Sequence, residues 1–242
     1  MPEVFDFDQG SEAWLRARLG IPTASRFAEV MAEGGGDRGL PQSVMDAMVK
    51  NGCTAAQLAA AVKAAKSRSA GYMRGKYLNE LAAERLRGTP EPDAYSNAHM
   101  ERGREQEDEA RELYAFTRNV TVTRVGFIRS GDAGCSPDSL IGDDGGLEIK
   151  SALGHIQVAR IRSGTLPSEH RAQVQGNLWI SGRAWWDFVS YSPDLPLFVV
   201  RVERDEEYIA ALARAVAAFN EELAAIVAAI GTAGDLAGRL AA

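Results

Sequence analysis

Two acidic residues and a lysine share one short stretch, GCSPDSLIGDDGGLEIK, which spans residues 134–150. Residues two apart on a β-strand share a face, so Glu148 and Lys150 would point to the same side of a strand. If the GDDG turn folds the preceding strand back, Asp138 comes to lie beside Glu148. Two carboxylates this close repel each other unless a positive charge separates them. A divalent cation such as magnesium, which prefers oxygen ligands, would separate them.

This grouping suits phosphodiester hydrolysis. A metal ion polarises the phosphate and activates a water, while Lys150 can orient that water or stabilise negative charge on the phosphorus centre. The alternative is that Glu148 and Lys150 are a solvent-facing pair on an antiparallel hairpin. Because an E-x-K triplet arises by chance about once in a chain of this length, the triplet alone favours this second interpretation.

The secondary structure predicted to position these residues changes along the chain, from helices before Asn119 to mainly strands after it. Helical periodicity and capping signals predict helices at 11–19, 23–32, 41–50, 54–66, 71–87 and 98–117. After Asn119, alternation and β-branched residues predict strands in VTVTRVGFI, GCSPDSLIG and GLEIKSA, with a hairpin turn at 142–145. A helix at 168–180, strands WWDFVSY and LFVVRVE, and a last helix at 205–230 capped by Asp205 follow. This order predicts a mixed sheet flanked by helices.

Composition narrows the class of protein. The chain has 242 residues, of which 45% are hydrophobic and 25% charged, which is typical of a globular protein. No run of about 18 apolar residues and no basic-then-apolar leader is found, so we expect a cytoplasmic protein with no membrane role. Its two cysteines, Cys53 and Cys135, and three scattered histidines match no thiolate or histidine metal motif, so carboxylates must hold any metal.

The net charge of −6 argues mildly against a protein that coats nucleic acid without specificity. Basic residues nevertheless cluster at 16–26, 63–76 and 102–104, while acidic residues gather at 203–207 and 221–222. A basic groove on an acidic body is therefore compatible with this sequence.

The stretch around Asp138 and Lys150 resembles the active-site hairpin of the phage λ exonuclease and YqaJ-type viral recombinase nucleases, members of the PD-(D/E)xK superfamily. Three further segments match this family in order: WLRARLGIPTASRF, MERGREQEDEARELY and HRAQVQGNLWISGRAWWDFVSY. The resemblance implies an α/β (α+β) restriction-endonuclease-like core, with a central mixed five-stranded sheet flanked by helices and a helical N-terminal part. It implies one nuclease domain over 1–242 with a helical insertion at about 37–68, for which we expect a lid or oligomer-contact role.

The same resemblance implies the metal centre. Asp138, Glu148 and the backbone carbonyl of Ile149 would bind the metal, and Lys150 would be the catalytic lysine. Glu107 would be an additional acid at the centre, acting directly or through water. Several neighbouring acids compete for this last role, and a solvated helix position is an equal alternative for Glu107.

A second set of positions matches residues that hold the 5′ phosphate of a DNA end in this family. The set consists of Arg18, Ser25, Ser136 and Gln173, with Gln175 as a weaker helper. An arginine fork with hydroxyl and amide donors suits a phosphate dianion. The alternatives are a surface helix residue for Arg18 and an N-cap for Ser25. Since Gln173 and Gln175 lie two apart on a predicted helix, they cannot face the same site squarely.

Four other residues offer weaker signals. Trp179, Trp185 and Trp186 are better explained as core or subunit contacts than as a base-stacking platform. His170 occupies a position where the family often has tyrosine. It would either approach the scissile region or be a helix-start residue without a catalytic role.

The resemblance implies a magnesium-dependent exonuclease that degrades linear duplex DNA from 5′ to 3′, with manganese as a substitute ion. It also implies phage-type recombination, a single-strand annealing protein as partner, and a homo-oligomeric ring around DNA. A structure-selective or site-specific endonuclease of the same superfamily is the first alternative, and a non-catalytic DNA-binding module is the second. The complete Asp138, Glu148 and Lys150 set argues against the non-catalytic alternative.

Overall fold

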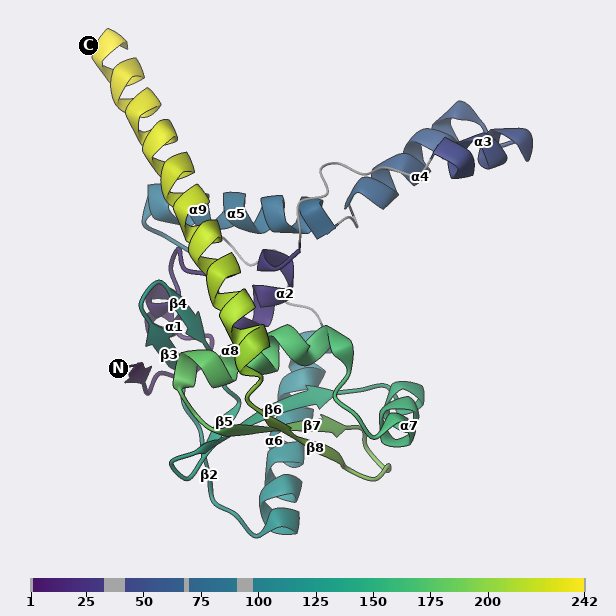
Figure 1. Ribbon diagram of the computed structural model, residues 1–242, viewed down its shortest axis with the longest axis vertical. Helices are drawn as coiled ribbons and strands as arrows, with labels where there is room; N and C mark the ends of the chain where they lie inside the picture. The colour runs from purple at the N-terminus through teal and green to yellow at the C-terminus, as the bar shows by residue number, and fades with distance from the viewer. Residues whose placement is uncertain (1, 33–41, 68–69, 91–97, 242) are drawn as a thin grey trace.

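A five-stranded mixed sheet lies at the centre of the protein, seen here in a computed structural model (Figure 1). Its strand order is β2 (Val122–Thr123), β5 (Ser139–Ile141), β6 (Gly145–Ser151), β7 (Trp185–Tyr191) and β8 (Phe198–Glu203). The β6–β7 pair is parallel and the other three pairs are antiparallel. The predicted mixed sheet is therefore confirmed. The structure describes the backbone of residues 2–32, 42–67, 70–90 and 98–241, and their side chains except at 63–67, 70, 98–105 and 233–241.

A second, three-stranded sheet was not expected from the sequence. It consists of β1 (Glu3–Phe5), β3 (Phe127–Ser130) and β4 (Ala133–Cys135). Two predicted strands are each divided between the sheets, one at Gly126 and the other at Pro137. Gly126 donates its N–H to Phe5, and a Cβ there would lie 2.1 Å from the carbonyl oxygen of Phe7. Pro137 has no N–H for a ladder, which favours a break.

Helices surround both sheets. Within the described residues they are α1 (Glu12–Ala17), α2 (Phe27–Val30), α3 (Gln42–Lys50), α4 (Ala55–Ser67), α5 (Ala70–Arg87), α6 (Ala98–Arg118), α7 (Gly154–Ser163), α8 (Arg171–Ser181) and α9 (Glu206–Ala241). Short 3₁₀ turns, η1 (Ala24–Arg26) and η2 (Ser168–His170), precede α2 and α8. Asp205 caps α9 by accepting the N–H of Tyr208 at 3.0 Å, as predicted.

Three helix predictions differ from the structure. The helix expected at 23–32, with Thr23 or Ser25 as its N-cap, is η1 followed by a single α-helical turn, and the Thr23 side chain makes no capping hydrogen bond. Helix α7 was not predicted, because its apolar residues are largely exposed and give no clear amphipathic stripe. Helix α9 continues to residue 241 rather than ending near residue 230.

The two faces of the large sheet have separate cores. On one face, Trp186 and Phe188 pack with residues of α5, α8 and α9. On the other, Leu147, Ile149 and Val189 pack against α6. Figure 1 shows α8 and the start of α9 on one side of the sheet and α6 on the other. The alternation of β6 therefore places Glu148 on the α8 side and its two apolar neighbours on the α6 side.

The tryptophans have the core roles expected of them. Trp186 is fully buried, and the ring of Trp179 packs 5.9 Å from that of Phe27. Trp185 packs against the α6-side core and stacks under the guanidinium of Arg201 at 3.6 Å. None of these three rings lies open as a base-stacking platform.

Two helical parts extend from the body. Helices α3 and α4 project from one end of α5 (Figure 1), and no residue of α3 is buried. They fall within the predicted insertion, whose residues 37–41 and 68 lie outside the described residues. Helix α9 rises to the C-terminus, and its segment Glu206–Thr232 is apolar and long enough to cross a membrane. This is weak evidence for a span, because the first half of that segment contributes Leu212, Phe219 and other residues to the core.

The glycine at position 146 leads to a stability prediction. A Cβ at Gly146 would lie 2.2 Å from the ring of the buried Trp186, so Gly146→Ala forces the ring or the strand to move. We expect a loss of about 1–3 kcal/mol in the free energy of unfolding, measured by urea denaturation.

Gly75→Ala is the matched control, since Gly75 lies inside α5 and a Cβ there has nothing within 4 Å. That substitution should be neutral or stabilise the protein by up to about 1 kcal/mol. Equal effects of the two substitutions would contradict the packing described here.

Candidate active site

Asp138 lies directly across from Glu148. In the antiparallel β5–β6 pair, Ser139 faces Leu147, so the next position along places Asp138 opposite Glu148. Asp138 Oδ2 accepts the backbone N–H of Ile149 at 2.5 Å, which ties the carboxylate to the second strand. The hairpin thus brings the two acids together as the sequence predicts.

Three donors surround the carboxylate of Glu148, whose side chain is only 1% exposed. Oε1 lies 2.6 Å from Lys150 Nζ and accepts Gln173 Nε2 at 2.5 Å, and Oε2 accepts Asn177 Nδ2 at 3.0 Å. Lys150 comes from the same face of β6, while Gln173 and Asn177 come from α8, where residues four apart are neighbours. Glu148 is therefore held in one orientation by two elements.

The two acids of this group, Asp138 and Glu148, outnumber its one amine, Lys150, and this excess of negative charge favours a bound cation. Burial raises the pKa of Asp138 well above its ordinary value, and the charges of Glu148 and Glu107 raise it further. Burial alone would lower the pKa of Lys150, but Glu148 and Asp138 raise it overall, so the amine stays protonated. A hard divalent cation would relieve the carboxylate repulsion, and the oxygens present are the donors that magnesium prefers.

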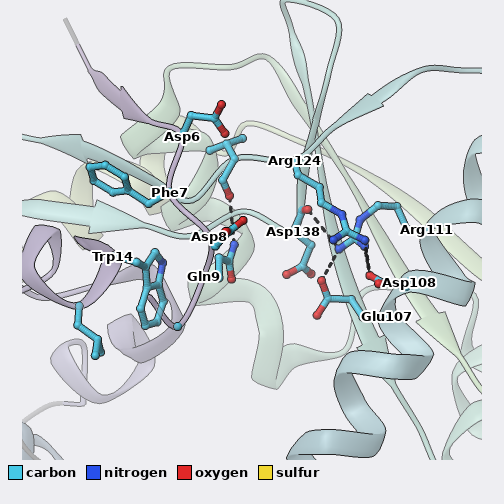
Figure 2. A pocket seen from close by; sticks show the side chains of 13 residues that line it. Asp6, Phe7, Asp8, Gln9, Trp14, Glu107, Asp108, Arg111, Arg124 and Asp138 are labelled. Carbon is cyan, nitrogen blue, oxygen red and sulfur yellow. Dashed lines mark hydrogen bonds and ion pairs between the residues drawn. The ribbon is translucent and has the colours of Figure 1, made fainter. Parts of the chain in front are cut away.

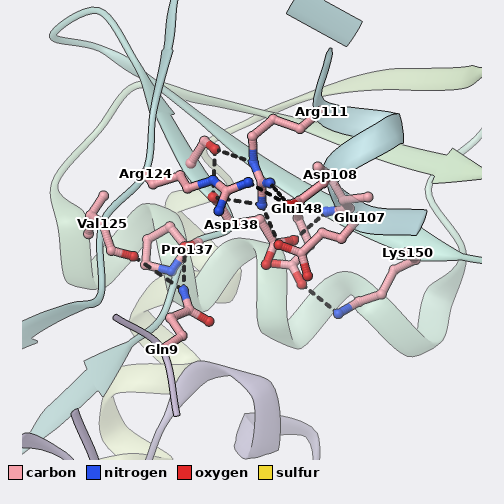
Figure 3. Close-up of polar contacts among 12 residues, drawn as sticks. Gln9, Glu107, Asp108, Arg111, Arg124, Val125, Pro137, Asp138, Glu148 and Lys150 are labelled. Atoms are coloured by element: carbon pink, nitrogen blue, oxygen red, sulfur yellow. Dashed lines mark hydrogen bonds and ion pairs between the residues drawn. The ribbon is translucent and has the colours of Figure 1, made fainter. Parts of the chain in front are cut away.

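Among the described residues, no group of three or more His, Cys, Asp and Glu side chains is arranged to hold a metal ion. Glu107 lies close enough to raise the pKa of Asp138, but its Oε1 is ion-paired with Arg111. Asp138 and Glu148 are thus the acids best placed to bind a metal. Ile149, which follows Glu148 on β6, donates its N–H to Asp138 and lies next to both acids. Figure 3 shows Glu107, Asp138 and Glu148 side by side, flanked by Arg111 and Lys150.

Arg111 of α6 is a site residue that the sequence analysis missed. It is buried and contacts Glu107, Asp108 Oδ1 at 2.5 Å, Ser139 Oγ at 3.0 Å and the carbonyl oxygen of Asp138 at 3.4 Å. The i, i+4 spacing of Glu107 and Arg111 was the available signal. Arg111 anchors α6 to the loop that carries Asp138.

A cavity of about 510 Å³ opens beside Asp138 (Figure 2). The N-terminal segment provides one wall, with Gln9 and Trp14, and α6 provides another, with Glu107 and Arg111. Gln9 Nε2 donates to the carbonyl oxygens of Val125 and Pro137, so the segment is fastened to the strand that leads into Asp138. The site is therefore bounded by residues far apart in the sequence.

Three of the residues predicted to bind a terminal phosphate are linked through Trp14 and Thr23. The guanidinium of Arg18 lies 3.9 Å from the centre of the Trp14 ring, and its Nη2 is 3.4 Å from Thr23 Oγ1. Thr23 Oγ1 is in turn 3.4 Å from Ser25 Oγ, and Trp14 Nε1 donates to Ser136 Oγ at 3.1 Å. Trp14 also lines the cavity that reaches Asp138. Trp14 and Thr23 were not predicted from the sequence as members of this cluster.

The two glutamines of α8 face different surroundings, as their spacing predicts. Gln173 reaches Glu148, so its observed contact is with an acid of the active site. Gln175 is buried, donates to the carbonyl oxygen of Glu203 at 2.9 Å and accepts the N–H of Asp205 at 3.0 Å. Because both ends of its amide hold the β8–α9 connection, we assign Gln175 a structural role in place of the phosphate-binding role expected of it.

His170 lies near Lys150 and packs against Phe188, with ring centres 4.9 Å apart. Burial lowers the pKa of His170 to about 4, and the charges of Lys150 and Arg160 contribute. Arg160 Nη2 lies 3.0 Å from His170 Nε2, and Arg160 Nη1 donates to Ser190 Oγ at 2.9 Å. The imidazole is therefore neutral at physiological pH and can accept the Arg160 hydrogen bond.

The YqaJ-like viral recombinase domain matches residues 46–184, more than half of the chain. An alkaline exonuclease (LHK-Exo) from Laribacter hongkongensis has a similar structure, with 33% identity, a TM-score of 0.72, and coverage of 93% of this chain and 100% of its own. LHK-Exo in complex with dAMP gives 34% identity, a TM-score of 0.73 and the same coverage.

A phage related exonuclease from Haemophilus somnus 129PT shares the fold at 15% identity, with a TM-score of 0.55 and coverage of 87% of this chain and 96% of its own. A search of curated proteins found no match. The domain match begins at residue 46, inside the predicted insertion, and therefore does not delimit that insertion.

The raised pKa of Asp138 leads to a prediction for the metal-free protein. An acid whose pKa rises on folding binds more protons in the folded state than in the unfolded state, so stability falls as pH rises above about 4. Asp138→Asn removes this charge. In EDTA at pH 7–8, the variant should be more stable than the wild type by about 1–2 kcal/mol. The gain should shrink as pH falls toward 4, and urea unfolding at several pH values measures it.

Asp132→Asn serves as the control, because the Asp132 side chain is 74% exposed. Its effect on stability should be within about 0.5 kcal/mol at every pH. A less stable Asp138→Asn protein across the whole pH range would contradict the charge repulsion inferred here.

Proposed function

The chain belongs to the YqaJ-like viral recombinase domain family, and we propose on this basis that it is a metal-dependent exonuclease that degrades linear duplex DNA from 5′ ends. The observation that carries the proposal is the convergence of Asp138, Glu148 and Lys150 on one hairpin. Solved structures of two exonucleases have the same fold. The family and this geometry independently favour phosphodiester hydrolysis.

Magnesium, held by Asp138, Glu148 and the carbonyl of Ile149, would supply Lewis-acid activation of the phosphate and of a water nucleophile. Glu107, ion-paired with Arg111, would assist through water. Manganese is a candidate substitute, since it also accepts oxygen ligands. The protein's own contribution is to hold these oxygens in a buried, rigid arrangement.

Lys150 has a distinct role in this proposal. Its pKa is raised by Glu148 and Asp138, so the amine carries its proton at neutral pH and is a donor rather than a base. A protonated amine 2.6 Å from Glu148 can donate to a phosphate oxygen and stabilise the charge that develops there. The general base is therefore not Lys150 in this arrangement.

The cluster around Trp14 supports action at an end of DNA. Arg18, Ser25 and Ser136 offer a guanidinium and two hydroxyls, which suit the two charges of a terminal phosphate. An enzyme that cuts inside a strand has no need for such a pocket. Gln173 was predicted for the same pocket, but its observed contact is with Glu148.

The wider setting is proposed from the family and the sequence. We place the protein in the cytoplasm of a bacterial host, in phage-type recombination with a single-strand annealing protein as partner. We also propose a homo-oligomer arranged as a ring around duplex DNA. Single-domain organisation over 1–242, with the α3–α4 region as an insertion, completes the proposal.

A time course on linear duplex DNA labelled at either the 5′ or the 3′ terminus tests activity, polarity and metal need together. With magnesium, the 5′ label should be released early and the 3′ label late, and EDTA should stop both. The same duplex closed into a circle should resist digestion.

Lys150→Ala should lower the rate of digestion at least 100-fold, because it removes the donor at the reacting phosphate.

Lys76→Ala is the matched control, since Lys76 lies on α5 and its amine pairs with Glu80. That variant should digest DNA at the wild-type rate. Cleavage of the circle at the same rate as the linear duplex would favour the endonuclease alternative. Undiminished turnover by Lys150→Ala would rule out the catalytic role given to it.

The phosphate pocket gives a separate prediction. Linear duplexes with 5′-hydroxyl ends should be digested about 10-fold more slowly than those with 5′-phosphate ends, because a charge-assisted contact is lost. Arg18→Ala should abolish that difference by slowing digestion of phosphorylated ends. Arg16→Ala is the control, because the Arg16 side chain is 73% exposed and pairs with Glu12. Equal wild-type rates on both ends would exclude the pocket.

A further inference from the structure

Asn177 is a buried polar residue next to an acid, in a helix whose other buried positions are mostly apolar. It is 1% exposed, and its neighbours on α8 include the buried Val174, Leu178 and Ile180. Its side-chain Nδ2 donates to Glu148 Oε2 at 3.0 Å. Among the contacts described for Glu148, this is the one made with Oε2.

The chemistry of the pair determines how the Asn177 amide is turned. An ionised carboxylate can only accept hydrogen bonds, so the NH₂ group of Asn177 must face Glu148. The opposite orientation would set two acceptors against each other. Asn177 Oδ1 is consequently directed away from Glu148, and it is a buried acceptor with no hydrogen-bond partner in the described part of the chain.

Two opposing effects act at Asn177. Its unpaired Oδ1 is a buried acceptor, which costs stability. Its Nδ2 supplies a donor to the buried Glu148 carboxylate, and an apolar residue at this position would remove the donor described for Oε2. The value of the amide at position 177 therefore lies in its contact with Glu148 rather than in packing within α8.

We infer that Asn177 is a positioning residue that fixes the plane of the Glu148 carboxylate, so that the acid presents its oxygens toward Asp138 and the divalent ion. This inference rests on the proposed metal-dependent function. Lys150 and Gln173 both contact Oε1, and Asn177 is the donor on Oε2. Rotation about the last side-chain bond moves both oxygens together, so contacts on opposite oxygens restrain the carboxylate plane more than contacts on one oxygen do.

The structure also explains why an asparagine on α8 can reach this acid. Glu148 points to the α8 side of the sheet, and Gln173 and Asn177 are one helical turn apart on the same face of α8. A Cβ at Gly176 would lie 3.1 Å from Ala24 Cβ and closer still to Phe27, so α8 is held tightly against η1 and α2. The amide is therefore carried on a rigid support.

Asn177→Leu is the test, because leucine has the same branched side-chain shape and no hydrogen-bond donor. Metal binding to the folded, DNA-free protein is measured by calorimetry with Mg²⁺ and with Mn²⁺, below the unfolding temperature. We expect the affinity of Asn177→Leu to be about 10-fold or more below that of the wild type. The magnesium concentration that gives half-maximal digestion should rise in parallel, with the rate recovering at high magnesium.

Gln175→Leu is the matched control. It removes another buried amide of α8, but one that contacts the backbone of Glu203 and Asp205 rather than Glu148. This variant should lose stability and keep the wild-type metal affinity. If Asn177→Leu does not fold, Asn177→Ala removes the same donor and carries the same expectation.

The outcomes separate the two claims. Wild-type protein that binds metal, together with an Asn177 variant that binds it equally well, would overturn the inference and leave the proposed function intact. Wild-type protein that binds no divalent ion would overturn the proposed function and the inference with it. Weaker metal binding by the Asn177 variant, with Gln175→Leu unchanged, supports the inference.

Discussion

The repulsion between two close carboxylates, the half-buried Asp138 and the buried Glu148, is the constraint on which the rest of this structure depends. Burial raises the pKa of Asp138, and the charge of Glu148 raises it further, so ionised Asp138 requires a positive partner. The protein surrounds them with donors: the N–H of Ile149, the amine of Lys150, and the amides of Gln173 and Asn177. These donors lower the free-energy cost of holding the two acids together, and a bound cation would lower it further.

Apolar packing on both faces of the large sheet holds the two mutually repelling acids in place. Leu147 and Ile149 anchor β6 in the α6-side core, which forces Glu148 to the opposite face. On that face α8 lies against the sheet and against η1, so its amides are positioned independently of β6. Arg111 then ties α6 to the loop of Asp138. Two cores of ordinary hydrophobic packing thus hold a site that would be unstable by itself.

Short-range pattern was enough to predict the hairpin, since strand alternation and one turn determine where Asp138, Glu148 and Lys150 point. The mixed sheet and most helices followed from periodicity, and the five-stranded core from the family resemblance. The amide donors to Glu148 could not be predicted as such, because which face of α8 meets β6 depends on tertiary packing. The division of two predicted strands between two sheets depends on the N-terminal strand β1, whose pairing with β3 spans more than 120 residues. The contacts of Gln175 could not be predicted either, because its partners Glu203 and Asp205 lie 28 and 30 residues away along the chain.

The most direct test of this account is to locate the metal itself. Crystals of the protein soaked in manganese, measured for anomalous scattering, would show where the ion binds. The account predicts one strong peak between the carboxylates of Asp138 and Glu148, with oxygen distances of about 2.0–2.3 Å. A peak elsewhere, or a crystal structure in which these two side chains face apart, would contradict it.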